Sequence, residues 1–205
     1  MLLFLIAMNL EPTRDFLREE IILENERARL TPLKKEDFDL LKDVAFDPQI
    51  WEKGLVKMEN EQDLEKYLQT ALGERRVGAS YPFLIYDKKF GAVAGSTRFG
   101  AISLAHKRME IGWTWLHPRF QGTGLNKAVK LAMLEFAFEV LKINRIEQKT
   151  DLINLQSQGA MTKLGATREG IFRRHSLTWT GRVRDSVFFS YILEEWPGIK
   201  ARFFA

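Results

Sequence analysis

The feature that most constrains the fold is a glycine-bearing segment between an extended run and a long apolar run. The segment reads Arg119-Phe120-Gln121-Gly122-Thr123-Gly124 and leads into apolar residues 125–141. A strand, a glycine turn and a helix in this order direct the free N–H groups of the first helical turn at an anion. The two glycines let the backbone approach a bulky phosphate. The segment therefore predicts a diphosphate site, with Arg119 and Lys127 adding positive charge on either side. An ordinary strand-to-helix turn is the alternative interpretation.

The bulk properties limit the class of protein. With 205 residues, 45% hydrophobic and 28% charged, the chain is long enough for one globular domain with a buried core. The net charge of +4 is not concentrated in blocks of Lys and Arg, so nucleic-acid binding is not expected. The absence of Cys excludes disulfides, thiolate metal sites and a cysteine nucleophile, and it fits a cytoplasmic protein.

The first residues are apolar but short. Residues 1–8 fall well below the roughly 20 apolar residues that span a bilayer, and they have neither a basic leader nor a cleavage site. No membrane association is expected. We treat residues 1–25 as an N-terminal extension, with Met8 as an alternative start, and residues 26–205 as one domain. Residues 1–8 would pack on the body or on a partner chain, and a homodimer is left open.

The hydrophobic pattern predicts a mixed fold. Alternation predicts strands at 28–33, 83–86, 92–99, 109–116, 145–150, 170–179 and 183–193, and helical spacing predicts helices at 34–45, 61–72, 125–141 and 155–164. Gly73 would end the second helix, 100–107 would form a loop, and Asn154 would cap the last helix. Strict alternation would place Trp113 and Trp115 on the face opposite Glu110. Together these elements describe an α/β (α+β) domain with a mostly antiparallel sheet.

Several ordered segments resemble the RimJ/RimL-like branch of the GNAT superfamily of N-acetyltransferases. Arg119, Gly122 and Gly124 fit its [Arg/Gln]-x-x-Gly-x-[Gly/Ala] coenzyme A loop, and the resemblance runs from about residue 26 to 196. Further matching segments are Gly95-Ser96-Thr97-Arg98-Phe99, Glu110-Ile111-Gly112-Trp113-Thr114-Trp115, Asn154-Leu155-Gln156-Ser157, Lys163-Leu164-Gly165-Ala166, Glu169-Gly170 and Arg184-Asp185-Ser186-Val187.

The resemblance implies how acetyl-CoA would bind. It implies a sheet splayed open between strands 109–116 and 145–150, with the cofactor in the V-shaped cleft and no metal. Pantetheine would pair with the backbone of Trp113, Thr114, Trp115 and Leu116. The remaining cofactor contacts would come from Arg119, Gln121, Gly122, Thr123, Gly124, Leu125, Asn126, Lys127 and Asn154.

The chemistry needs a base and a proton donor. An α-amine, with an ordinary pKa of about 7.7–8.0, needs less help to lose its proton than a lysine at about 10.4. Glu110 is our candidate base, with a structural ion pair to Arg98 or another cation as the alternative, and Asp151 is a weaker candidate. The resemblance makes Ser157 the proton donor to the departing thiolate, directly or through water. Asn154 and Ser157 as ordinary helix-start residues are the alternative.

The acceptor side is less defined by the sequence. Trp51, Arg98, Phe99 and His175 are candidate substrate-binding residues, and the three histidines have no metal-ligand spacing. The resemblance favours a protein N-terminal α-amine as acceptor. A small amine such as an amino acid, a polyamine or an aminoglycoside is the alternative, as is a protein that holds an acyl-CoA without catalysis.

Overall fold

The structure is a computed structural model that describes residues 16–205. The expectations for residues 1–8 lie outside the described residues. Among those described, Phe16 is buried in the core and Leu23–Glu24 forms the first strand, β1. Within residues 16–205 no helix is long and apolar enough to cross a membrane.

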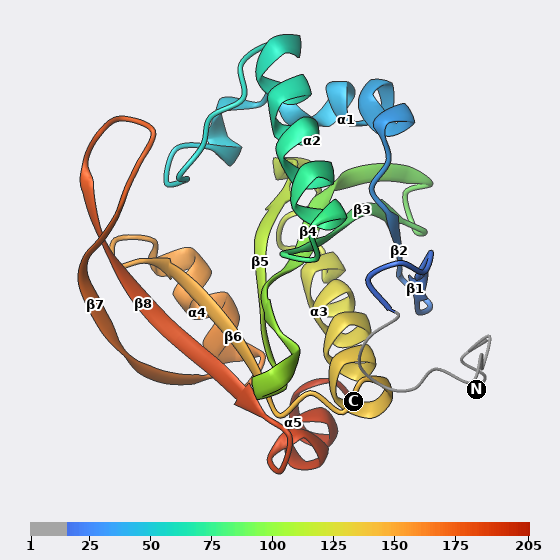
Figure 1. Cartoon of the computed structure of the whole chain (residues 1–205), viewed down its shortest axis with the longest axis vertical. Coiled ribbons are helices and arrows are strands. Elements are labelled where there is room, and N and C mark those ends of the chain that lie inside the picture. Colours follow the sequence, from blue (N-terminus) through green and yellow to red (C-terminus); the bar gives the residue numbers. More distant parts are fainter. Residues whose placement is uncertain (1–15) are drawn as a thin grey trace.

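One eight-stranded sheet organises the chain, in the order β1-β2-β3-β4-β5-β6-β8-β7 (Figure 1). Neighbouring strands are antiparallel except β5 and β6, which run parallel. This confirms the mixed, mostly antiparallel sheet. The other strands are β2 (Ala28–Pro32), β3 (Tyr81–Asp87), β4 (Ala92–Ser103), β5 (Arg108–Leu116), β6 (Arg145–Asp151), β7 (Thr167–Leu177) and β8 (Val183–Ile192).

The helices cover both faces of the sheet. They are α1 (Phe38–Ala45), α2 (Glu61–Arg76), α3 (Leu125–Glu135) with a π-helical extension Phe136–Val140, α4 (Leu155–Lys163) and α5 (Trp196–Phe203). Alternation along β4 shows the layers, because successive side chains point to opposite faces. Ser96 contacts α2 through Tyr67, whereas Thr97 contacts α3 through Met133. We call these the α2 face and the α3 face.

Two predicted boundaries were wrong and one helix was not predicted, each for an identifiable reason. Helix α2 continues through Gly73 to Arg76 and is followed by Gly78, whose φ of +72° suits the chain reversal. Strand β4 continues to Ser103, because Gly100 and Ser103 still pair with β5 where a loop was expected. Helix α5 was not expected. Its buried Trp196 packs on Phe138, a contact between segments far apart in the sequence.

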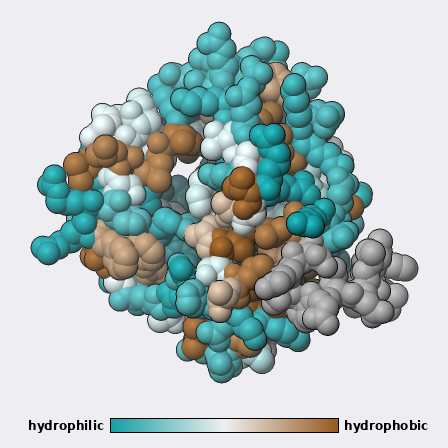
Figure 2. All heavy atoms as spheres, viewed as in Figure 1, coloured by the Kyte–Doolittle hydropathy of each residue, from teal (hydrophilic) through white to brown (hydrophobic). Residues whose placement is uncertain are grey.

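The sheet opens between β5 and β6. Their parallel pairing covers only Arg108–Arg145, Met109–Ile146 and Glu110–Glu147. Beyond Glu110, β5 continues to Leu116 without a partner from β6, while β6 remains paired with β8 to Asp151. Figure 1 shows the two strands diverging, and Figure 2 shows the surface hollowed between the β7–β8 hairpin and β5. The expected splay is therefore present, and Glu110 lies at its origin.

Candidate active site

The glycine loop lies at the N-terminus of α3, beside the open end of β5. Gly122 and Gly124 have φ values of +72° and +89°, a conformation that glycine adopts without the penalty of a Cβ. A Cβ at either position would meet nothing within 4 Å. Both glycines are therefore required by backbone conformation, while the space above them is open.

Hydrogen bonds to other segments hold the glycine loop in position. The Gln121 amide donates to the carbonyl of Leu116 (3.0 Å) and accepts from the Gln156 amide of α4 (3.1 Å). The Thr123 hydroxyl donates to the carbonyl of Phe120 (2.7 Å) and accepts from Arg27 (3.2 Å). The loop is thus positioned from the end of β5, from α4 and from the start of β2.

The first turn of α3 fits an anionic ligand. Gly124 is the N-cap residue and supplies no side chain to the N–H groups of the first turn, which contains no acidic residue. Arg119 and Lys127 are exposed on either side. Free N–H groups at a helix start, open space and flanking cations are the features that bind a phosphate. The residues present therefore fit the diphosphate of coenzyme A.

A β-bulge changes which residues of β5 face the cleft. Between the pairs Arg98–Gly112 and Ser96–Trp115, residues 113 and 114 lie opposite a single residue of β4. Trp113 has a φ of +50°, a strained value for a tryptophan. The bulge reverses the alternation, so the predicted faces of Trp113, Thr114 and Trp115 were wrong. The Trp113 ring lies on the α2 face with Glu110, whereas Thr114 points to α3.

Glu110 is buried on the α2 face and forms an ion pair with Lys149 of β6. Its carboxylate lies over Gly112, where a Cβ would come within 2.6 Å of Oε1. The glycine that follows Glu110 by two residues therefore makes room for the carboxylate. An ion pair across the origin of the splay holds Glu110 and links the two diverging strands. The cation expected as the structural alternative is thus Lys149 and not Arg98.

Arg98 forms a different pair. Its side chain is 2% exposed, and Nη1 donates to Oε2 of Glu74 in α2 (2.8 Å). The guanidinium carbon lies 5.0 Å from the ring centre of Tyr67 and 5.2 Å from that of Trp113. These contacts hold the Trp113 ring in place on the α2 face. Arg98 thus supports the residue that shapes the cleft.

Lys130 is a buried cation that the pattern of α3 did not predict. Its side chain is 6% exposed, and Nζ donates to the Thr114 hydroxyl (2.8 Å). That hydroxyl lies 2.7 Å from the hydroxyl of Thr97. Burial lowers the pKa of Lys130 to about 7, and the Glu110 carboxylate opposes this shift. The polar partner of Lys130 is present because the bulge turns Thr114 toward α3. Hydrophobic periodicity could therefore not predict that Lys130 is buried.

Residues at the start of α4 lie as expected. The Asn154 side chain accepts a hydrogen bond from the backbone N–H of Ser157 (3.1 Å), which confirms the predicted cap. The Ser157 side chain is partly exposed. Asp151 is buried, accepts from the N–H of Ile153 (3.2 Å) and forms an ion pair with Arg182. Asp151 thus stabilises the strand end and the β7–β8 hairpin.

The candidate acceptor residues divide between the core and the cleft. Phe99 is fully buried against Phe83 and Phe136, on the α3 face and away from Glu110. Trp51 is also buried and packs on Trp115, with ring centres 5.3 Å apart. His175 of β7 reaches the α2 face, where Nδ1 lies 3.0 Å from the Ser186 hydroxyl. Burial lowers the pKa of His175, and the charges of Lys149 and Arg184 lower it further, so the uncharged ring is favoured.

A contact across the hollow joins two distant loops. The indole N–H of Trp179, near the tip of the β7–β8 hairpin, donates to the carbonyl of Trp51 (3.0 Å). Lys57 lies over the same indole ring, 4.5 Å from its centre. The α1–α2 loop and the hairpin therefore meet on the α2 side of the cleft, and Trp179 is the residue that connects them.

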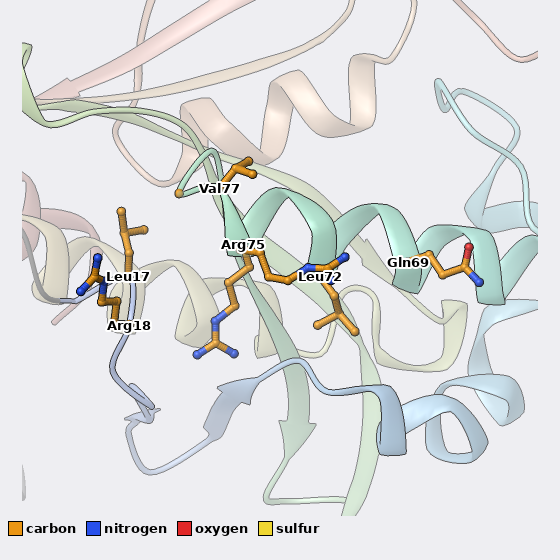
Figure 3. A pocket seen from close by; sticks show the side chains of 8 residues that line it. Leu17, Arg18, Gln69, Leu72, Arg75 and Val77 are labelled. Atoms are coloured by element: carbon orange, nitrogen blue, oxygen red, sulfur yellow. The ribbon is translucent and has the colours of Figure 1, made fainter.

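A separate cavity lies away from this cleft (Figure 3). It measures about 1020 Å³ and is lined by Leu17, Arg18, Gln69, Leu72, Arg75, Arg76, Val77 and Gly78. The Arg75 side chain already has hydrogen-bond partners there, since it donates to the carbonyl of Glu19 (3.2 Å) and to the hydroxyl of Tyr81 (3.3 Å). None of these residues belongs to the cleft. Within residues 16–205 no cluster of His, Asp and Glu side chains is arranged to hold a metal ion.

Comparison with known proteins agrees with this geometry. The chain is 26% identical over 182 residues to the Bacillus subtilis protein named "Putative ribosomal N-acetyltransferase YdaF", covering 86% of this chain and 97% of that protein. A GCN5-related N-acetyltransferase from Brucella melitensis has 27% identity and a TM-score of 0.84, covering 94% of this chain and 87% of that chain. An acetyltransferase structure from T. thermophilus has 34% identity and a TM-score of 0.80, covering 89% of this chain and 94% of that one.

The family model described as "Acetyltransferase (GNAT) domain" matches residues 27–167, which include the glycine loop, the bulged strand and Glu110. The names of the relatives and the shared fold both indicate that the chain is an acyltransferase. The chain therefore belongs to the GNAT family of acetyltransferases.

Proposed function

We propose that the chain is an acetyl-CoA-dependent N-acetyltransferase whose acceptor is a protein N-terminal α-amine, attacked directly in a ternary complex. The observation that carries this proposal is the position of Glu110. It lies where β5 and β6 part, with the free helix start of α3 at the far end of the same opening. One opening thus connects the N-terminus of α3, which is the proposed diphosphate site, with a buried carboxylate.

Relatives support the cofactor and the acceptor class. The name of the Bacillus subtilis relative refers to a ribosomal N-acetyltransferase. RimJ from Mycobacterium smegmatis, solved in complex with CoA-disulfide, shares the fold at 21% identity and a TM-score of 0.72, covering 87% of this chain and 88% of that one. These relatives favour coenzyme A as the bound group and a protein as the acceptor.

The chain offers three sets of groups to acetyl-CoA. The N–H groups of Gln121–Leu125 would hold the diphosphate. The backbone of Trp113–Leu116, which β6 leaves without a ladder partner, would hold the pantetheine arm. The Asn154 amide nitrogen is available at the start of α4, since its oxygen serves as the cap. When bound, acetyl-CoA supplies an acetyl group activated as a thioester.

Glu110 would take the proton of the acceptor amine. An α-amine, with a pKa of about 7.7–8.0, arrives at neutral pH as a mixture of charged and neutral forms. Its ammonium group would approach the Glu110 carboxylate beside Lys149, and the carboxylate can then accept the proton directly or through water. A free N–H of the bulged strand would stabilise negative charge on the acetyl oxygen. Ser157 would donate a proton to the departing sulfur.

Steady-state kinetics with acetyl-CoA and a panel of amines tests this function. The panel contains peptides with free α-amines, the same peptides with blocked α-amines and a lysine, and small amines. We expect turnover of free α-amine peptides, with mass spectrometry placing the acetyl group on the α-nitrogen. Binding of coenzyme A without turnover of any amine would instead indicate an acyl-CoA-binding protein.

One observation favours a small amine as second candidate. The hydrogen bond between Trp179 and Trp51 joins the β7–β8 hairpin to the α1–α2 loop on the α2 side of the cleft, and a peptide acceptor entering between them would have to separate the two loops. Turnover of small amines with no turnover of peptides would select this alternative. In that case Trp179→Phe, which removes the donor of the bond, should increase access for longer acceptors.

A further inference from the structure

Arg184 is a buried cation on the acceptor side of the cleft that lacks an ion-pair partner. It lies in β8, is 6% exposed, and Nε donates to the Ser186 hydroxyl (3.0 Å). Among residues 16–205 no carboxylate forms an ion pair with it. A buried charge is costly unless it is paired. Lys130, the other buried cation without a carboxylate partner, lies on the α3 face, so among the described residues Arg184 is the unpaired buried cation of the α2 face.

The register of the sheet places Arg184 on the same face as Glu110. Lys149 lies opposite Phe188, and Asp151 lies opposite Ser186, in the pairing of β6 with β8. Since alternate residues of a strand share a face, Arg184, Ser186 and Phe188 lie on the face that carries Lys149. Lys149 in turn pairs with Glu110. Figure 1 shows β6 and β8 side by side along the open part of the sheet.

The charged side chains near Arg184 are paired with each other, so the charge of Arg184 has no counter-charge. Lys149 is neutralised by Glu110, and Arg182 by Asp151. His175, whose Nδ1 also contacts the Ser186 hydroxyl (3.0 Å), favours its uncharged form because burial lowers its pKa. Asp151 and Glu110 favour the charged form of Arg184, but burial outweighs them and lowers its pKa. The cluster of Arg184, His175, Ser186 and Lys149 thus carries one uncompensated positive charge.

We propose that this cluster binds a carboxylate of the acceptor, so that the acceptor is an amine that also carries an acidic group. The proposal rests on the proposed function and specifies its substrate class. Arginine is suited to this task, because its planar guanidinium can donate two parallel hydrogen bonds to a carboxylate. The amine would meet Glu110 while the acidic group meets Arg184, and the two charges of the acceptor would fix its orientation.

The experiment uses matched acceptors that differ only in charge. Aspartate and asparagine, and glutamate and glutamine, are offered to the wild type as free amino acids and as the first residue of otherwise identical peptides. We expect kcat/KM at least 10-fold higher for the carboxylate member of a pair, as the free amino acid or as the peptide. The form that shows this preference identifies the source of the carboxylate.

Variants test whether Arg184 causes the preference. Arg184→Met should lower kcat/KM for the carboxylate member at least 10-fold and change that of the carboxamide member little, with the coenzyme A Kd unchanged. Arg184→Lys, which keeps the charge, should retain part of the preference. Arg76→Met removes an exposed arginine from α2 and should change neither value. Equal kcat/KM values of the wild type for the two matched acceptors would overturn the proposal. An equal loss of kcat/KM for both acceptors in Arg184→Met would also overturn it.

A binding measurement separates this proposal from the proposed function. Isothermal titration of aspartate and asparagine into the wild type in the presence of coenzyme A does not require turnover. If no amine is acetylated, the proposed function fails, yet tighter binding of aspartate that Arg184→Met abolishes would still support the carboxylate site. Absence of any binding difference in the wild type would overturn it.

Discussion

At the scale of single residues, burial and pairing decide what the charged groups of the cleft can do. Glu110 and Lys130 are both about 5% exposed, but they lie on opposite faces of β5 and have different partners. Glu110 is paired with the ammonium of Lys149, whereas Lys130 has only the hydroxyl of Thr114 as its hydrogen-bond partner among the described residues. Glu110 therefore has a counter-charge, while the charge of Lys130 is opposed by its surroundings.

Glu110→Gln should lower kcat by about 100-fold, because the amide cannot accept a proton from the acceptor amine. The Kd of coenzyme A should not change, since Glu110 lies on the α2 face and not at the diphosphate loop. Glu147→Gln is a matched control, because Glu147 lies opposite Glu110 in β6 but pairs with Arg108 and Arg145. Equal kcat values for the two variants would argue against Glu110 as the base.

Lys130→Met should remove a pH dependence of stability. The pKa of Lys130 is about 7 in the folded protein, against about 10.4 in an unfolded chain. Between these values the unfolded chain binds the extra proton, so the stability of the wild type rises with pH, by up to about 1.4 kcal/mol per pH unit. The destabilisation caused by Lys130 is therefore largest near pH 7 and below.

Urea unfolding at pH 7, 8 and 9 measures this effect. The stability of Lys130→Met relative to the wild type should be highest at pH 7 and should fall as the pH rises. Lys127→Met removes an exposed lysine from the same helix and should differ from the wild type by a constant amount. A difference for Lys130→Met that is independent of pH would contradict the assigned burial effect.

At the scale of elements, two local deviations from regular structure make the site. The bulge in β5 turns Trp113 toward the α2 face, and the left-handed residues of the glycine loop leave the α3 N-terminus open. Hydrophobic periodicity assumes an unbroken alternation, so it could not place residues 113–115 correctly. The glycine loop was predictable because its conformation depends on glycine itself. Element types followed from the sequence better than side-chain faces did.

Gly100→Ala should destabilise the protein by about 1–3 kcal/mol, as expected for overpacking. A Cβ at Gly100 would lie 2.2 Å from the ring of Trp113, whose bulged backbone leaves it little freedom to move. Gly170→Ala is the control, because Gly170 also lies in a strand but would meet no atom within 4 Å. Chemical denaturation measures both variants. Similar midpoints would show that the Trp113 ring is not held over Gly100.

Gly124→Trp should abolish coenzyme A binding by filling the open space at the start of α3. Gly181→Trp is a matched control, since Gly181 has a similar φ of +79° and also has open space around it, but lies in the β7–β8 turn. Both variants carry the same backbone penalty for a left-handed residue. Isothermal titration should therefore show loss of binding in Gly124→Trp alone, and equal affinities would contradict the location of the diphosphate.

At the scale of the whole molecule, the parallel pairing of β5 with β6 determines where the site lies. Every other neighbouring pair of strands is antiparallel, and this one pair is short enough to open after Glu110. The resemblance to the GNAT family predicted this opening, whereas composition and periodicity did not. The ion pair of Glu110 with Lys149 and the burial of Arg184 depend on contacts between distant strands. A single sequence could not show them.

The most direct test is a crystal structure of the chain with coenzyme A. The diphosphate should lie within hydrogen-bond distance of the backbone N–H groups of Gln121–Leu125, and the pantetheine arm should follow Trp113–Leu116 into the opening toward Glu110. A diphosphate bound elsewhere, or a pantetheine arm that leaves the molecule without approaching Glu110, would contradict the proposed active site.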